Sequence, residues 1–174
     1  AGQTATFRWT INNTGCTSID DVILTNYALP AAPTTTGGSN CGTGTVSLSA
    51  TGSGTIYWYS ASSGGSALGS GTSFTTPSIS TTTTYYAASY LNGCYSATRT
   101  AATATINTPP TTANAGSDQS QCNNSTFYMS ANTPSVGAGV WTRVSGTSGT
   151  ITTASDPFTS ITGLAAGQTA TFRW

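Results

Sequence analysis

The sequence contains no Lys, no Glu and no His, and its four Arg and four Asp give a formal net charge of zero. Acid–base catalysis would therefore depend on Asp alone, and only Asp20 and Asp21 are neighbours, so we expect neither an enzyme nor a bound cofactor. A basic surface that could follow a phosphate backbone is missing, which argues against nucleic acid as a partner. No loop has the alternating Asp spacing of a calcium site, so we expect no metal site either.

Long apolar runs are also missing. No segment approaches the ~20 apolar residues that a membrane-spanning helix needs, so we expect no membrane insertion. The sequence is instead rich in Thr, Ser and Gly, with eight Tyr and four Trp. β-Branched and aromatic residues, separated by turn-forming residues throughout, favour an all-β fold.

The first nine residues, Ala1–Trp9, return unchanged as Ala166–Trp174, an offset of 165 residues. Such a repeat predicts one period of a tandem array in a continuous polypeptide, cut in mid-strand, with identical repeats before and after it as partners. Polar and apolar residues alternate in both copies, which predicts a strand with one buried face. We expect complementation of this strand between repeats through the apolar positions of the two copies: Ala5, Phe7, Trp9, Ile11, Ala170, Phe172 and Trp174.

Two modules are expected in each 165-residue repeat. Residues 27–109 form a complete one, opened by Pro30 and Pro33 and closed by Pro109-Pro110. Residues 110–174 are the first part of the next module, completed by the following repeat's equivalent of 10–26. Residues 1–26 are accordingly the last hairpin of a module that begins in the preceding repeat. Within the complete module we expect strands near 45–50, 55–60, 72–77, 83–90 and 95–106.

Landmark residues follow the same order in both modules. Cys41, Trp58, Tyr86 and Cys94 correspond to Cys122, Trp141, Phe172 and Cys16. Short strands with an early Trp and a Tyr-rich late strand are typical of a β-sandwich. The sequence thus predicts tandem Ig-like β-sandwiches, one of them split by the chain ends. Its predicted core residues are Trp9, Trp58, Trp141, Phe172 and Tyr86.

Several motifs resemble a known group of proteins: 81–87 (Thr-Thr-Thr-Thr-Tyr-Tyr-Ala) followed by Asn92-Gly-Cys94, 115–118 leading to Cys122, and 163–167 before Phe172. Together they are similar to the Ig-like and PKD-like repeats of giant secreted surface proteins of Bacteroidetes, including gliding-motility adhesins and filament proteins. The resemblance implies an extracellular or cell-surface location and a mechanical, adhesive role as a repeat unit of a filament or stalk.

The four cysteines, none in a Cys-x-x-Cys pair, indicate disulfides in an oxidising, extracellular compartment. One hypothesis pairs Cys41 with Cys94 inside a module, and Cys122 with the next copy's Cys16. The other joins module ends: Cys41 with the next copy's Cys16, and Cys94 with the previous copy's Cys122. Cys41 and Cys94 should lie about 20 Å apart, one strand length. That distance favours the second hypothesis, because a disulfide needs Cα atoms within ~7 Å.

A further set of residues raises an alternative function, a carbohydrate- or surface-binding module. Tyr57 and Tyr59 flank Trp58 and should face away from the core, where they could contact a glycan or a neighbouring chain. Asn12, Asn123 and Asn124 each begin an N-glycosylation sequon. For the Tyr residues the competing interpretation is ordinary cross-strand packing on the surface of a sheet.

Overall fold

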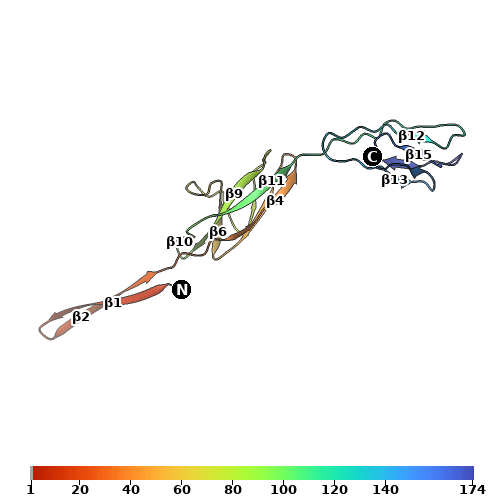
Figure 1. The fold of residues 1–174 in the computed structure, drawn as a ribbon. Helices are drawn as coiled ribbons and strands as arrows, with labels where there is room; N and C mark the ends of the chain where they lie inside the picture. Colours follow the sequence, from red (N-terminus) through yellow and green to blue (C-terminus); the bar gives the residue numbers. More distant parts are fainter. Residues whose placement is uncertain (1) are drawn as a thin grey trace. The chain divides into compact units, whose positions relative to one another are not determined.

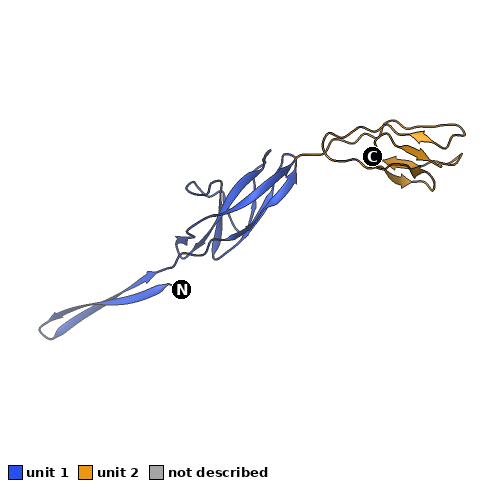
Figure 2. Cartoon of the chain, viewed as in Figure 1, with its two compact units in different colours: residues 1–107 blue, residues 108–174 orange. Residues whose placement is uncertain are grey.

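The computed structural model describes residues 2–174; Ala1, the first residue of the repeated segment, lies outside the described residues. The described chain is all-β, with sixteen strands (Figure 1), and the predicted fold class is confirmed. Residues 2–174 include no helix long and apolar enough to cross a membrane. The chain divides into two compact units, residues 1–107 and 108–174, shown in different colours in Figure 2.

The first unit begins with a long antiparallel hairpin. Strands β1 (Gln3–Asn13) and β2 (Cys16–Asn26) pair without interruption from Gln3↔Asn26 to Asn13↔Cys16. Thr14 and Gly15 form its two-residue loop with φ of 40° and 85°. Two positive φ angles define the loop type whose twist matches that of paired strands, and Gly15 adopts such a φ without steric cost. Every residue of both strands is exposed.

The rest of the first unit is a two-sheet sandwich, which we call the first sandwich (residues 34–107). One sheet has the order β3 (Thr34–Thr36), β5 (Ser47–Thr51), β8 (Ser73–Thr75). The other has the order β4 (Gly38–Cys41), β11 (Thr100–Asn107), β9 (Thr83–Leu91), β6 (Thr55–Tyr59), β7 (Gly69–Ser70), with β10 (Cys94–Tyr95) also on β9. The predicted last strand, 95–106, is interrupted between β10 and β11.

The first sandwich has a dense core around Trp58. Its side chain is fully buried, stacks on Phe74 with ring centroids 5.5 Å apart, and donates a hydrogen bond from Nε1 to the Gly71 carbonyl. The core also contains Leu48, Ile56 and Tyr85. Tyr85, not the predicted Tyr86, occupies the core position of β9, because alternation along this strand turns Tyr85, Ala87 and Ser89 inward and leaves Tyr86 half-buried.

The first and last strands of the larger sheet in the first sandwich, β4 and β11, pair in parallel. Strand β4 lies beside β11, in register from Ala104↔Gly38 to Asn107↔Cys41. The preceding strand, β3, pairs in the other sheet, so the chain changes sheets at Gly37. A Cβ on Gly37 would lie 2.5 Å from the Thr103 carbonyl oxygen. Glycine is therefore required where the backbone crosses β11 this closely.

The second unit (residues 108–174) holds two smaller sheets. One has the order β12 (Phe127–Tyr128), β15 (Ser160–Thr162), β14 (Thr150–Ile151). The other consists of β13 (Thr142–Ser145) and β16 (Thr171–Arg173). The buried residues of the second unit are Ala131, Trp141, Thr159 and Ile161. Where the first sandwich has a six-stranded sheet with β11 inside it, the second unit has a two-stranded sheet.

Candidate assembly site

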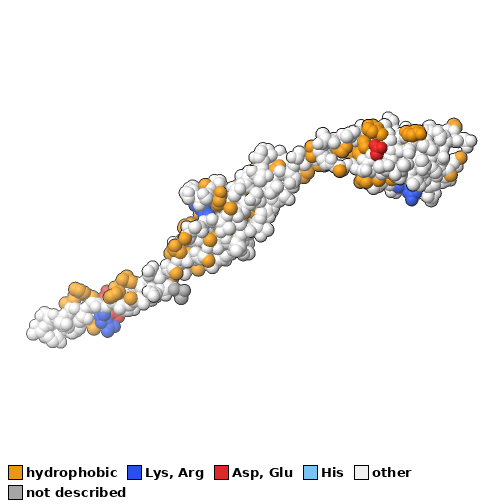
Figure 3. Space-filling view, in the orientation of Figure 1, with side chains coloured by type: hydrophobic (Ala, Val, Ile, Leu, Met, Phe, Trp, Pro, Cys, Tyr) orange, Lys and Arg blue, Asp and Glu red, His pale blue; other side chains and the backbone are white. Residues whose placement is uncertain are grey.

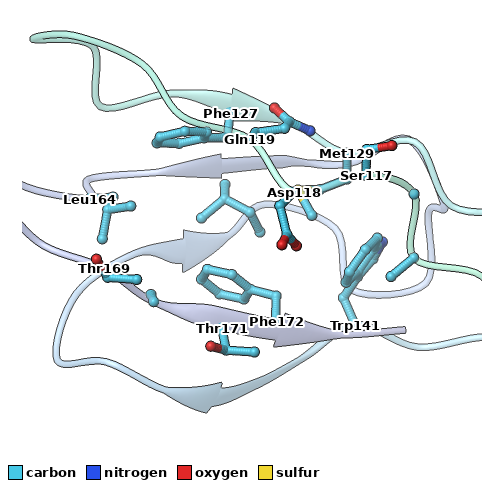
Figure 4. A pocket seen from close by; sticks show the side chains of 14 residues that line it. Ser117, Asp118, Gln119, Phe127, Met129, Trp141, Leu164, Thr169, Thr171 and Phe172 are labelled. Carbon is cyan, nitrogen blue, oxygen red and sulfur yellow. The ribbon is translucent and has the colours of Figure 1, made fainter.

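The second unit has an open groove beside β16. The groove encloses about 320 Å³. Figure 4 shows Trp141 and Phe172 on one side, Phe127 and Met129 on the other, and the Asp118 carboxylate drawn between Phe172 and Trp141. Ile161 and Leu164 add to the apolar lining. Trp141 and Ile161 are buried, whereas Phe127, Met129, Leu164 and Phe172 are half-buried.

In the first sandwich, β11 fills the corresponding space. The two units can be aligned on Trp58 and Trp141. Trp58 lies opposite Ala87 on β9, and the β13–β16 register, continued by one residue, places Trp141 opposite Trp174. Trp174 is therefore the equivalent of Ala87. Strand β11 pairs with β9 and turns Ala102 and Ala104 into the core. Strand β16 has no such neighbour among residues 108–174. The second unit therefore lacks a strand that the first sandwich has.

The β1–β2 hairpin has the features of that missing strand. One of its faces carries Ala5, Phe7, Trp9 and Ile11 from β1 and Val22 and Leu24 from β2, together with two polar residues of β2, Asp20 opposite Trp9 and Ser18 opposite Ile11. All of these are exposed, Trp9 by 71%, and Figure 3 shows apolar side chains along the hairpin. Trp9 was predicted as a core residue of a module that begins in the preceding repeat; in the single chain it is exposed, and its place in such a core stays a prediction. The same residues in the second copy, Ala170, Phe172 and Trp174, are half-buried.

The opposite face of the hairpin is more polar. It carries the Thr residues of β1 with Ile19 and Ile23 of β2, and an ion pair in its middle. Arg8 donates from Nε and Nη2 to the two carboxylate oxygens of Asp21, at 2.8 and 2.9 Å. This hydrogen-bonded pair lowers the pKa of the Asp21 carboxyl below its ordinary value. The hairpin thus has one face suited to a core and one suited to solvent.

The ion pair leads to a pH-dependent prediction. A lowered pKa in the folded hairpin means that the ion pair stabilises it above the ordinary carboxyl pKa, and that this contribution is lost as the pH falls through the lowered pKa. We expect Arg8→Gln to raise the pKa of Asp21, as measured by an NMR titration of its carboxyl carbon. Arg143→Gln, in the second unit, is the control and should leave Asp21 unchanged. An Asp21 pKa unaffected by Arg8→Gln would contradict the pairing.

The Tyr candidates have different surroundings. Tyr57 packs edge-on against Tyr90 and Tyr95, each 5.8 Å away between ring centroids. Tyr59 was expected on the surface but is only 6% exposed. The Arg99 guanidinium lies 3.3 Å from its ring centroid and is held there by the carbonyls of Ala61 and Gly64. A long loop after β6 and an Arg from far along the chain bury Tyr59, and alternation cannot reveal either.

The four cysteines are free thiols. Cys41 ends β4 beside Asn107, and Cys94 follows the turn at the other end of β9. Thr83 and Leu91 bound β9, so the two cysteines lie about 25 Å or more apart along the sheet. The Cys41–Cys94 bridge is therefore absent, because the thiols stand at opposite ends of the first sandwich. The pairings with Cys16 and Cys122 of other copies stay predictions.

The sequon asparagines lie in exposed loops or strand ends. Asn12 accepts a hydrogen bond from the Thr17 hydroxyl, and Asn124 accepts one from the backbone N–H of Thr126. Asn123 has a positive φ of 53°. Glycosylation at these residues stays a prediction. No group of three or more Cys and Asp side chains with the spacing of a metal site occurs within residues 2–174.

Several residues of the site were not identified from the sequence. Val22 and Leu24 lie in the run Val22-Ile23-Leu24, where three apolar residues in succession hide the alternation. Met129 directly follows β12, and Ile161 lies in its partner β15; both strands are very short and have no periodic pattern. Val22 could have been identified by taking Thr14-Gly15 as a two-residue loop, because the resulting strand register places Val22 opposite Phe7.

The fold places the first sandwich among Ig-like domains, which are structural or binding modules. Residues 30–110 match the family model described as the CHU_C-associated Ig-like domain. The matched segment contains the whole of the first sandwich and extends to residue 110, just inside the second unit. A search of curated proteins found no match to this chain.

Proposed function

We propose that this protein is a structural repeat unit of a long extracellular filament or adhesin stalk on a bacterial surface. In this assembly the β1–β2 hairpin of one copy completes the second unit of its neighbour. The hairpin and the open groove are two incomplete structures within one chain. Each supplies what the other lacks, and a copy that both donates a hairpin and accepts one makes a head-to-tail contact, the kind of interface that builds filaments when it does not close into a ring.

One observation carries this proposal: the hairpin exposes a largely apolar face, interrupted by Asp20 opposite Trp9, while the second unit has an open groove lined by apolar side chains. Phe7 and Trp9 lie on the hairpin, and Trp141 and Phe172 line the groove. Exposed apolar patches of this kind mark interaction sites, and unpaired strand edges are templates for another chain. The CHU_C-associated Ig-like domain supports a secreted, cell-surface location.

The test is the assembly state of the purified full-length chain. We expect light scattering after size exclusion to show species larger than 17.5 kDa that grow with concentration, and electron microscopy to show beaded filaments. A constant mass of one chain at every concentration, with compact particles on the grid, would overturn the proposal. Reduction with a thiol should leave the filaments present if strand pairing, not disulfide formation, holds them.

The alternative function, carbohydrate or surface binding, has support from one surface. Tyr57, Tyr90 and Tyr95 form an aromatic cluster, and Tyr95 is 46% exposed. A tyrosine face of this kind can stack on a sugar ring. The arrangement is also that of cross-strand aromatic packing, since Tyr90 and Tyr95 are a direct pair between β9 and β10. We therefore retain the structural function as the main proposal.

A further inference from the structure

The proposed assembly leaves open which strands meet and along which edges. The nine-residue repeat is present twice in the described structure, apart from Ala1, and has a different partner in each place. In the hairpin, β1 pairs with β2; in the second unit, β16 pairs with β13. A strand has two hydrogen-bonding edges, so the two partners can be compared by the edge that each uses.

In the hairpin, odd-numbered residues of β1 face β2 with their backbone groups. Asn13↔Cys16 closes a two-residue loop, and this closing pair exchanges both of its backbone hydrogen bonds. Counting back by twos, the N–H and C=O groups of Ile11, Trp9 and Phe7 also point to β2. Those of Arg8 and Thr6 point to the opposite edge, which is unpaired in the hairpin.

In the second unit, the opposite edge of the same sequence is used. The Trp141 N–H donates to the Ala154 carbonyl at 2.7 Å, so the backbone groups of the next residue, Thr142, point the other way, toward Arg173. Arg173 and Thr171 correspond to Arg8 and Thr6 in the repeat. The backbone groups of Phe172, which correspond to those of Phe7, face the open groove side.

From these opposite edges we infer that the nine-residue sequence is the central strand of a sheet shared between copies, in the order β13, repeat, β2. This inference rests on the proposed function. On assembly, β1 of a second copy replaces β16 beside β13. The exchange keeps the strand's own contacts, because the sequences are identical, and adds β2 to the second unit.

The first sandwich supplies a template for this arrangement. Its sheet has β6, β9 and β11 side by side, and Trp58 lies opposite Ala87. Aligning Trp9 with Ala87 makes Phe7 equivalent to Tyr85. Val22 and Leu24, which pair with Phe7 and Ala5, then take the places of Ala102 and Ala104 of β11. Those two alanines are buried in the core, so the two hairpin residues are predicted to fill the groove.

The second unit already contains a position that fits the Trp9 side chain of another copy. Trp174 occupies it, with its ring centroid 5.4 Å from that of Trp141 and its Nε1 donating to the Asn132 carbonyl at 3.1 Å. Gly139 lies against this ring, where a Cβ would approach to 2.0 Å. A Trp side chain thus has a backbone acceptor, an aromatic neighbour and a glycine that leaves room for it. Trp9, exposed in the hairpin, gains all three on exchange.

The test is a disulfide between two full-length chains in which the four native cysteines are replaced by Ser. Ser145 lies opposite Thr171, the equivalent of Thr6. Ser145→Cys in one chain and Thr6→Cys in the other should therefore crosslink when mixed and oxidised. The control pair is Ser145→Cys with Thr4→Cys, which points the same way but lies two residues out of register, beyond the ~7 Å Cα limit of a disulfide.

We expect about tenfold more crosslinked dimer from the Thr6 pair than from the Thr4 pair, since only the former meets the disulfide distance. Oligomers that form without the Thr6 crosslink, or with equal crosslinking of both pairs, would overturn the shared central strand and leave the proposed function standing. If the mixed chains form no oligomers at all, the proposed function fails and the inference fails with it.

Discussion

Replacing Trp58 by Ala is expected to lower the free energy of unfolding of the first sandwich by about 3–5 kcal/mol, the range for a fully buried large aromatic residue. Trp58 is 0% exposed, stacks on Phe74 and donates to the Gly71 carbonyl. The substitution removes these contacts and leaves a cavity beside Tyr85. Hydrogen exchange at the amides of β9, measured across a series of urea concentrations, reports the decrease in unfolding free energy of this unit alone.

The chain contains a matched control for this substitution. Trp9→Ala removes the same side chain from the hairpin, where it is 71% exposed. We expect no change in the unfolding free energy of the first sandwich. A loss at Trp9 equal to that at Trp58 would show that the hairpin packs on the sandwich. Trp58→Phe, which retains an aromatic ring but no Nε1 donor, should lie between Trp58→Ala and the native chain.

Placing a carboxylate at Val22 is expected to prevent assembly. The proposed contact buries this side chain beside the residue equivalent to Phe7, at the position of the fully buried Ala102. Val22→Asp forfeits about 2 kcal/mol of apolar burial and adds the cost of desolvating an unpaired charge, so we expect affinity between copies to fall about 100-fold or more. Concentration-dependent light scattering measures the change.

Ile23→Asp is the control for that charge. Ile23 adjoins Val22 on β2, is 66% exposed and lies on the opposite face of the hairpin. If the groove accepts the Val22 face, Ile23→Asp should assemble like the native chain, apart from a small effect of the added charge. Equal loss in both variants would indicate that the charge, and not the buried face, is responsible. Equal assembly of both would remove Val22 from the interface.

Much of the fold follows from local patterns. The strands expected near 55–60 and 83–90 match β6 and β9 within a residue or two, and alternation along the duplicated segment predicted strand β1. Long-range packing decided the rest. Tyr59 is buried by Arg99, forty positions along the chain, and the choice of Tyr85 over Tyr86 depends on which β9 face meets Phe74. No local pattern contains that information.

The candidate site was only partly visible in the sequence. Alternation along the duplicated segment predicted a strand with one buried face, and Phe172 of this segment lines the groove. Trp141, predicted separately as a core residue, also lines it. The missing strand became apparent only from the comparison of two sheets, one holding β11 and the other ending at β16. Val22 and Leu24 gain their meaning from that comparison and from the hairpin register, not from composition.

The parallel pairing of β4 with β11 has a mechanical consequence. These are the first and last strands of their sheet in the first sandwich, so tension applied at the two ends of this domain pulls them in opposite directions along their common axis. Their ladder, from Ala104↔Gly38 to Asn107↔Cys41, is loaded in shear, and its hydrogen bonds share the force instead of opening one after another. The domain should therefore resist stretching more strongly than the antiparallel β1–β2 hairpin, which the same force applied to its two ends would unzip pair by pair.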